Sequence, residues 1–387
     1  MAAEVAVLVS SYQRPWHVRR VLESLRYQDV PAGTFEVVVT DDGSTDETAA
    51  MVRAFADSAP FEVQFVTHEH NGFQLARCRN EGVAASSAPY ILFLDGDCLV
   101  APDHIRTHLT HRRVGRVCGT VFHRLTRAAS ASISLARVAD GSFRRLTLGS
   151  ERRRLAILAW KSEIYQRFGH PTRPKLMGCN IGLWRSDYER VNGYDENFVG
   201  WGCEDDDLRA RLARAGMKIR SLLRYTSSWH LWHPTDPTAA ARWREGANVG
   251  YLQRGIRLTR CVHGLVARES REIAVRVTGA GRHPEIIKWL PKWLRHAPQA
   301  PEIDILVLPG EGSFHPQADC RVLVVAEHAP VPENLWRQAH LVFVAPGAGS
   351  AVSAPWYHAR EMDDVLRREL LARHTPKVVE PAVQRAA

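Results

Sequence analysis

The sequence predicts an α/β fold in which a mainly parallel sheet is flanked by helices. Short apolar runs alternate with amphipathic segments through the first hundred residues, and such alternation is typical of parallel sheets. The apolar runs contain few polar residues, as expected for strands that are covered on both faces. Polar residues follow several of these runs, at the positions where an open parallel sheet binds its ligands.

Each expected element has a local signal of its own. Strands are expected in the β-branched and aromatic runs at residues 5–11, 35–40, 61–68 and 90–94. Helices are expected in the amphipathic stretches at residues 14–28, 44–56 and 74–86. Pro15 suits the first turn of a helix, and Ser44 and Glu47 have the spacing of a capping box.

Small polar and acidic residues stand at the ends of three expected strands. They are Ser10, Ser11, Asp41, Asp42, Gly43, Asp95, Gly96 and Asp97. In "DGD" (95–97) the glycine lets the chain bend, so that both carboxylates can face one cation. Mg²⁺ and Mn²⁺ prefer such oxygen ligands and often share them with substrate phosphates. A polar turn is the alternative, but the position after the fourth strand favours a metal site.

A second acidic cluster, "GWGCEDDDL" (200–208), allows two interpretations. Acidic residues in the first turn of a helix are stabilised by the helix dipole and need no further role. The following segment, 208–219, is typical of an arginine-rich helix that Gly216 closes. Alternatively, one of the acids takes part in catalysis.

The composition indicates a globular protein with anionic partners. Its 45% hydrophobic and 24% charged residues are ordinary; no apolar stretch reaches the ~20 residues of a membrane span, and we expect no signal peptide. Seven cysteines without a CxxC pair favour a reducing compartment, hence the cytoplasm. The net charge of +9, from 51 basic and 42 acidic residues, favours nucleotide diphosphates, acidic polymers or anionic lipid surfaces. No nucleic-acid partner is expected, because no basic run is interleaved with aromatic residues.

Four motifs together resemble the family 2 glycosyltransferases, which have the GT-A fold: "VLVSSYQRP" (7–15), "VVVTDDGSTDET" (37–48), "HNGFQLARCRNEGVAAS" (70–86) and "YILFLDGDCLV" (90–100). The run "NGFQLARCRNEG" is especially similar to the nucleotide-sugar domains of bacterial chondroitin and hyaluronan synthases. The resemblance implies that Asp42 holds a uracil ring and that Arg79 helps to seat the nucleotide. It also implies that Asp95 reaches the ribose and the metal and that Asp97 ligates the metal. Donor binding is implied as well for Ser10, Tyr12, Arg14 and Gly96.

The segment 177–208 resembles the C-terminal part of animal β-1,4-galactosyltransferases and of chondroitin polymerases, where a loop reads roughly WGGED. Here Cys203 replaces the second glycine and lacks the backbone freedom of glycine. The resemblance assigns the catalytic base to Asp205, which must be within reach of the acceptor hydroxyl. Glu204 would position the acceptor or donor sugar. Trp201, with Gly202 beside it, would stack on a sugar ring.

Other roles follow from the same resemblance. Asn180 lies in a loop that approaches the donor sugar in the relatives. A histidine in "SSWHLWHPTDP" (227–237) would complete the metal site; His230 fits best by spacing, and His233 is the alternative. Asp206 and Asp207 are left to cap the helix.

Domain boundaries are expected as follows. The catalytic domain is residues 1–258. It comprises a nucleotide-binding half (1–100), a variable acceptor-side insert (112–176) and the galactosyltransferase-like segment (177–258). After it come a linker (259–300), a small α/β accessory region of unknown role (301–375) and a disordered tail (376–387).

The basic "IIKWLPKWLRH" (286–296) could contact a membrane surface as an interfacial helix, but Pro291 favours a linker with its tryptophans packed inward. His104, His108 and His111 are one face of an expected helix and are surrounded by arginines, so we expect that face to be solvated or to meet phosphate.

These observations predict a metal-dependent, inverting glycosyltransferase. It would move a hexose, an N-acetylhexosamine or a uronic acid from a UDP-sugar to an acceptor hydroxyl, with Mn²⁺ or Mg²⁺ as cofactor. The acceptor would be a glycan, a lipid-linked glycan or another hydroxyl compound, and the basic insert favours an anionic one. The alternatives are a nucleotidyltransferase and a non-catalytic protein that binds sugars or polymers.

Overall fold

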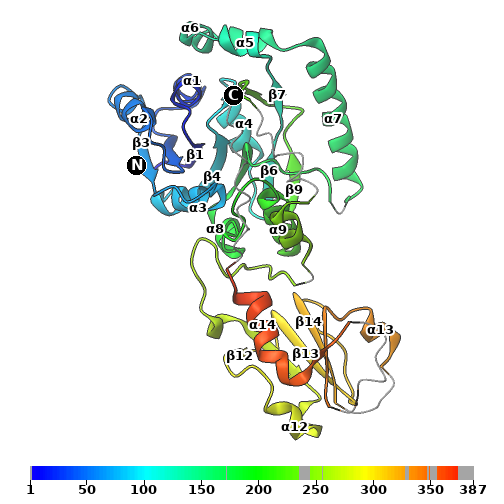
Figure 1. The fold of residues 1–387 in the computed structure, drawn as a ribbon. Coiled ribbons are helices and arrows are strands. Elements are labelled where there is room, and N and C mark those ends of the chain that lie inside the picture. The colour runs from blue at the N-terminus through cyan, green and yellow to red at the C-terminus, as the bar shows by residue number, and fades with distance from the viewer. Residues whose placement is uncertain are drawn as a thin grey trace, which may run out of the picture. The chain divides into compact units, whose positions relative to one another are not determined.

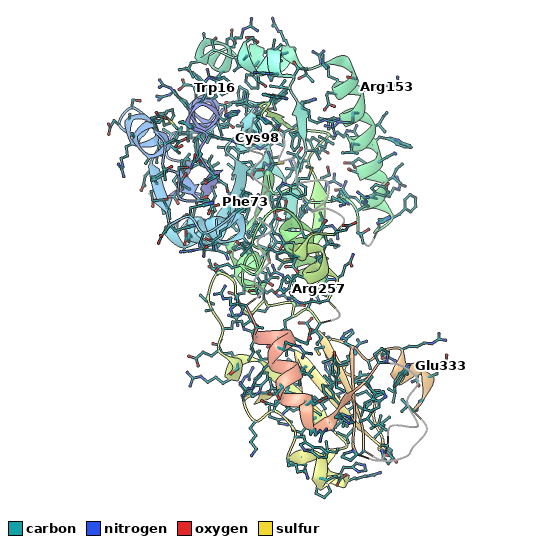
Figure 2. The ribbon with its side chains drawn as sticks, in the orientation of Figure 1. Trp16, Phe73, Cys98, Arg153, Arg257 and Glu333 are labelled. Carbon is teal, nitrogen blue, oxygen red and sulfur yellow. The ribbon has the colours of Figure 1, made fainter. Side chains whose placement is uncertain are left out.

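The chain folds into two compact units that divide between Leu252 and Gln253. The computed structural model describes residues 2–170, 172–234, 245–254, 256–326, 331–346, 348 and 355–373. Each unit has its own sheet with helices around it (Figure 1), and Figure 2 adds the side chains. The predicted disordered tail, 376–387, lies outside the described residues.

The first unit is built on a seven-stranded sheet in the order β3-β2-β1-β4-β8-β6-β9. Its strands are β1 (Val5–Ser11), β2 (Phe35–Asp41), β3 (Val63–Thr67), β4 (Tyr90–Asp95), β6 (Arg116–Gly119), β8 (Asn180–Trp184) and β9 (Lys218–Ser221). Strand β8 runs antiparallel to β4 and β6, whereas the other neighbours pair in parallel. The predicted mainly parallel α/β sheet is confirmed. Every residue of β1 and β2 is buried, while the edge strand β3 is half-buried.

Three helices connect the first four strands: α1 (Pro15–Arg26), α2 (Thr48–Ala56) and α3 (Leu75–Ala85). Pro15 occupies the first turn of α1, as predicted. The capping box predicted for Ser44 and Glu47 does not form. Instead, Ser44 Oγ donates to Asp41 Oδ1 at 2.6 Å, because a carboxylate at the strand end is the stronger acceptor.

The remaining helices of the first unit follow the fourth strand. They are α4 (His104–His111), α5 (Arg127–Ala131), α6 (Leu135–Ala139), α7 (Gly149–Arg167), α8 (Arg185–Arg190), α9 (Glu204–Arg214) and α11 (Ala247–Gln253). The solvated face predicted for α4 is wrong, since His104 and His108 are fully buried. Gly216 follows α9 in the left-handed conformation (φ +88°), as expected for its C-terminal cap.

A second, three-stranded sheet joins two distant parts of the first unit. Its order is β5 (Cys98–Val100), β10 (Ser228–His230) and β7 (Phe122–Arg124). Strand β10 is antiparallel to β5, and His230 lies opposite Cys98 in the register. Since "DGD" directly precedes β5, this pairing brings the end of β10 to the acids at the end of β4.

The second unit contains a six-stranded sheet in the order β12-β11-β13-β14-β15-β16, in which all pairs are parallel. The strands are β11 (Ala274–Thr278), β12 (Arg295–His296), β13 (Ile303–Leu308), β14 (Cys320–Val325), β15 (Leu341–Val344) and β16 (Tyr357–His358). The helices are α12 (Pro284–Ile287), α13 (Glu333–Trp336) and α14 (Met362–Leu371). An α/β accessory region was predicted, but the predicted linker 259–300 is part of it, since it supplies β11 and β12.

Two further predictions concern membranes. The half-buried Trp289 and Trp293 pack against the core of the second unit, as predicted for a segment with its tryptophans inward. Among the described residues, no helix combines the length and the apolar composition needed to cross a bilayer.

Candidate active site

The "DGD" turn is held against the end of β1. Gly96 N–H donates to Ser10 O at 2.8 Å. A Cβ at position 96 would lie 2.6 Å from the same oxygen, so only glycine fits this close approach. Ser10, Gly96 and the two flanking acids are therefore gathered at the carboxyl end of neighbouring parallel strands.

Asp97 is the centre of a group with metal-ligand chemistry. His230 Nε2 lies 3.6 Å from Asp97 Oδ1, and His233 Nε2 lies 3.2 Å from Asp97 Oδ2. The ligand atoms of these three residues all lie within 4.8 Å of one another. Arg14 Nη1 donates to Asp97 Oδ2 at 3.0 Å. Both histidines that the sequence offered as alternatives thus face the same carboxylate.

The neighbours of Asp97 keep its carboxylate ionised. Burial would raise the pKa of Asp97, but the hydrogen bond to His233 and the charges of His230, His233 and Arg14 hold that pKa well below its usual range. Burial lowers the pKa of His230, while the bond to Asp97 raises that of His233. One ionised carboxylate and two imidazoles are a donor set that fits Mn²⁺.

Arg79 links the two acidic clusters that the sequence pointed out. Its side chain is 1% exposed, yet its guanidinium donates to Asp205 Oδ1 at 2.9 Å and to Asp95 Oδ1 at 3.1 Å. Glu204 Oε1 lies 3.8 Å away. Asp95 is therefore paired with Arg79 and stands apart from the group of Asp97 and the two histidines. Burial raises the pKa of Asp95 to about 6, against the opposing charge of Arg79.

Asp205 is held by three donors at the start of α9. Besides Arg79, Tyr194 Oη donates to Asp205 Oδ1 at 3.0 Å, and Gly178 N–H donates to Oδ2 at 2.7 Å. A Cβ at position 178 would collide with both the guanidinium and the carboxylate. The neighbouring Glu204 is 8% exposed. Burial and the charge of Asp205 raise the pKa of Glu204 to about 8, which favours its protonated form.

The loop before α9 takes the glycine-like path despite its cysteine. Gly200, Gly202 and Cys203 have φ values of +87°, +91° and +76°. Gly200 N–H donates to Phe73 O at 2.7 Å, and Asn248 Nδ2 donates to Gly202 O at 3.0 Å. Trp201 lies between these glycines and is half-buried.

The last two acids of the cluster lie in the first turn of α9, as predicted for residues that the helix dipole stabilises, and both also pair with basic side chains. Asp207 Oδ2 accepts from Arg211 Nε at 2.7 Å, and both side chains are buried. Asp206 Oδ2 lies 3.5 Å from Lys175 Nζ. Asp207 is drawn inward because Arg211, one turn later on α9, is itself buried and needs a counter-charge.

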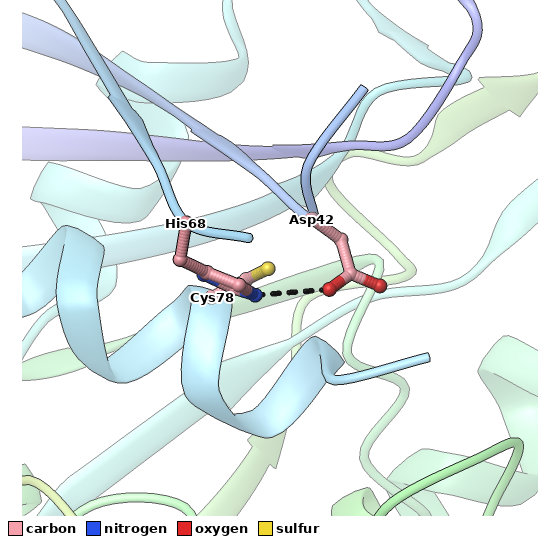
Figure 3. A group of neighbouring side chains, drawn as sticks. All are labelled: Asp42, His68 and Cys78. Atoms are coloured by element: carbon pink, nitrogen blue, oxygen red, sulfur yellow. Dashed lines mark hydrogen bonds and ion pairs between the residues drawn. The ribbon is translucent and has the colours of Figure 1, made fainter. Parts of the chain in front are cut away.

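The residues expected to bind the nucleotide base meet at the end of β2. Asp42 N–H donates to Ser11 O at 3.0 Å. Its carboxylate lies 3.0 Å from His68 Nε2 and accepts from Gln74 N–H at 3.1 Å. Tyr12 stacks on His70 with ring centroids 4.4 Å apart. Figure 3 shows Asp42 with His68 and Cys78 beside it.

Two family models match the first unit. "Glycosyl transferase family 2" matches residues 6–184, and "N-terminal domain of galactosyltransferase" matches residues 163–233. The first unit is therefore similar to family 2 glycosyltransferases over residues 6–184. Its sheet and its galactosyltransferase-like segment agree with the GT-A fold that the resemblance implied.

Three relatives show how this glycosyltransferase domain compares with known proteins. Validoxylamine A glucosyltransferase from Streptomyces hygroscopicus subsp. jinggangensis is 29% identical over 252 residues, covering 61% of this chain and 57% of that protein. Chondroitin synthase from Escherichia coli is 23% identical over 202 residues (49% and 29%). β-1,4-Galactosyltransferase 4 from Homo sapiens is 33% identical over 105 residues (26% and 30%). The predicted resemblance is confirmed, although the chain spans little more than half of the Streptomyces relative.

The glycosyltransferase domain does not place Asn180 where the resemblance implied. Asn180 begins β8 and is fully buried. Its Nδ2 lies 2.9 Å from His104 Nε2, and its Oδ1 lies 3.1 Å from His108 Nε2. The side chain therefore joins α4 to the sheet and does not reach a donor sugar.

Sequence reasoning missed three residues of the glycosyltransferase site. Tyr194 contacts both Asp205 and Arg79, with the guanidinium 4.9 Å from the centre of its ring. His68 and His70 contact Asp42. The rule that pointed to the acids would have found these histidines, because they follow β3 at the same edge of the sheet.

Proposed function

We propose that the protein is a metal-dependent, inverting glycosyltransferase that uses a UDP-sugar. The observation that carries this proposal is the link between two acidic clusters more than a hundred residues apart. Arg79 contacts Asp95 at the end of β4 and Asp205 at the start of α9. One cluster offers a cation site for a diphosphate, and the other offers a base for an acceptor hydroxyl. The match of residues 6–184 to the family 2 model supports the reaction class.

Asp97, His230 and His233 would hold the cation, Mn²⁺ or Mg²⁺. When bound, the cation neutralises charge on the leaving diphosphate. Arg14, which contacts Asp97, would meet a phosphate oxygen. Asp42 would accept the N–H of the uracil ring, with Tyr12 beside it. Ser10 and Asp95 line the strand ends between these groups.

Asp205 would remove the acceptor proton as the acceptor oxygen attacks the anomeric carbon from the face opposite the diphosphate. That geometry inverts the configuration at the anomeric carbon. Protonated Glu204 would donate a hydrogen bond to a sugar oxygen, and Trp201 would stack on a sugar ring. The transferred sugar would be a hexose, an N-acetylhexosamine or a uronic acid, which agrees with the names of the glucosyl-, galactosyl- and chondroitin-forming relatives. An acidic acceptor and a cytoplasmic location stay predictions.

The direct test is UDP release from a panel of UDP-sugars with Mn²⁺. We expect slow hydrolysis of one donor, faster release when the right acceptor is added, and loss of both with EDTA. Release of pyrophosphate from a nucleoside triphosphate and a sugar phosphate would instead favour a nucleotidyltransferase. Sugar binding without release from any donor would favour the non-catalytic alternative.

Replacing Asp205 tests the base separately from donor binding. We expect Asp205→Asn to reduce transfer by about a thousandfold, within the range of a lost general base, and to leave the Kd of UDP with Mn²⁺ unchanged. Asp206→Asn is the matched control, because it lies one residue away and contacts only a half-exposed lysine. Loss of UDP binding in Asp205→Asn would contradict the assigned role. So would equal activity in the two variants.

A further inference from the structure

His68 lies between two carboxylates at the edge of the donor site. Its Nε2 is 3.0 Å from Asp42 Oδ1, and its Nδ1 is 2.7 Å from Glu81 Oε2. The side chains of His68 and Asp42 are 5% and 4% exposed, so water does not compete strongly for these contacts. His68 comes from the end of β3 and Glu81 from α3, so two elements fix the imidazole.

The two partners of His68 limit how its ring can form hydrogen bonds. A neutral imidazole has one N–H donor and one acceptor nitrogen. Both ring nitrogens of His68 face carboxyl oxygens, and an ionised carboxylate only accepts. With Asp42 and Glu81 both ionised, both contacts are hydrogen bonds when both nitrogens of His68 carry a proton.

Neighbouring groups keep this arrangement in place. Arg77 Nε donates to Glu81 Oε1 at 2.8 Å, one turn along α3. Gln74 N–H donates to the second oxygen of Asp42 at 3.1 Å. His70 Nδ1 contacts Asp42 O at 2.7 Å. Burial raises the pKa of Asp42, and the contacts with Gln74 and His68 oppose that rise.

We propose that His68, oriented by Glu81, is a positioning residue that keeps Asp42 ionised and makes the donor site selective for uracil over cytosine. The proposal rests on the proposed function, in which Asp42 meets the base. A carboxylate can only accept hydrogen bonds. Uracil presents N3–H to such a group, whereas cytosine presents an N3 lone pair. An ionised, fixed Asp42 therefore pairs with UDP and repels CDP.

A metal ion is the competing explanation of the same residues, since atoms of Asp42, His68 and Cys78 lie close enough to share one. Figure 3 shows these side chains and the bond from His68 to Asp42. Both nitrogens of His68 already face carboxylates. Burial raises the pKa of the Cys78 thiol above its usual value, which disfavours the thiolate that binds a metal.

The experiment compares the Kd of UDP and of CDP, by calorimetry with Mn²⁺, in the wild type and in His68→Ala, His68→Gln and Glu81→Gln. Losing a hydrogen bond between charged groups raises a Kd by roughly tenfold. We expect His68→Ala to weaken UDP binding about tenfold and to reduce the preference for UDP over CDP. Glu81→Gln should weaken UDP binding by about threefold and also reduce the preference for UDP over CDP. His68→Gln, which keeps an N–H donor without the charge, should be intermediate.

Kinetics and controls separate positioning from folding. In UDP release, KM for the UDP-sugar should rise while kcat changes by less than about threefold. Glu333→Gln breaks an exposed pair with Arg337 in the second unit and should change nothing. Glu81→Gln, at a partly exposed position, keeps the test valid if His68→Ala does not fold.

Two results would overturn the inference. One is an unchanged UDP/CDP ratio in folded His68 and Glu81 variants. The other is stoichiometric Zn²⁺ binding that Cys78→Ser abolishes, because the group would then be a metal site. If the wild type binds no UDP at all, the proposed function itself is wrong and this inference fails with it.

Discussion

Cys203 shows how one residue can depart from a family pattern and keep its backbone. Its φ of +76° lies in the left-handed region, which costs a non-glycine residue about 1–2 kcal/mol. Its side chain is 7% exposed, so burial offsets part of that cost. The neighbouring bonds to Gly200 and Gly202 hold the loop on either side. Cysteine is tolerated because it is small and unbranched.

Substitutions at position 203 should separate backbone strain from packing. We expect Cys203→Val to lower the free energy of unfolding by at least about 2 kcal/mol, because a β-branched residue strongly resists positive φ. Cys203→Gly should change it by less than about 1 kcal/mol, since relief of strain offsets lost burial. Urea denaturation measures both. Equal loss in the two variants would show that packing of the thiol, and not φ, decides stability here.

At the scale of elements, α4 is joined to the sheet by a buried polar network. His104 Nδ1 contacts Thr226 Oγ1 at 2.8 Å, and its Nε2 contacts Asn180. His108 bonds to the same asparagine. Burial lowers the pKa of His108 to about 4 and that of His104 well below its usual value. The face of α4 that the sequence predicted to be solvated is thus buried against the sheet.

The network predicts a pH dependence of stability. Above about pH 6.5 these histidines are neutral in both the folded and the unfolded state, and their contribution is fully present. As the pH falls from about 6.5 towards 4, His108 becomes protonated in the unfolded chain but stays neutral in the folded protein. The free energy of unfolding therefore decreases. For His108 alone the loss is about 3 kcal/mol, because each tenfold difference in proton affinity between the two states corresponds to ~1.4 kcal/mol.

Urea unfolding between about pH 3.5 and 7.5, a range that includes the His108 pKa values of the folded and the unfolded state, measures this dependence. His108→Gln should flatten it, whereas His111→Gln, a half-buried position on the same helix, serves as the control. A slope unchanged by His108→Gln would contradict the assignment.

At the scale of the whole molecule, the chain forms two units with separate cores. The second unit buries strands β11, β13 and β14 in a core of its own. Among the described residues of this unit, the most buried charge is Asp304, which is 0% exposed and accepts from Arg276 Nε at 2.8 Å. Separate cores allow separate unfolding transitions.

Asp304→Ala should therefore destabilise the second unit alone. We expect a loss of about 3 kcal/mol, because Arg276 and the His315 N–H lose their acceptor. Calorimetry should show two unfolding transitions, of which only that of the second unit has a lower Tm. UDP release by the first unit should stay unchanged. Glu333→Ala, in an exposed ion pair, should shift neither. Movement of both transitions together would contradict independent units.

The acidic residues of the site could be predicted from the sequence more readily than the residues that contact them. Asp42, Asp95 and Asp97 could be predicted because strand ends in a parallel sheet share one edge, and apolar periodicity locates those ends. His68 follows β3 at the same edge and could have been found by the same rule. Tyr194 could not, since its role depends on which side chains meet in space. Asn180 was misplaced because its motif lies near the site while its side chain points inward. The linker 259–300 was wrong because β11 and β12 are short and carry charged residues.

The sequence by itself determined the α/β class, the first four strands, the resemblance to family 2 glycosyltransferases and the two acidic clusters. These follow from local periodicity and from motif spacing, which the chain carries in one dimension. Only the tertiary structure decided that Arg79 joins Asp95 to Asp205, that both His230 and His233 face Asp97, and that α4 turns its histidines inward. Those contacts join residues far apart in the chain, and packing and charge pairing select them only once the sheet has formed.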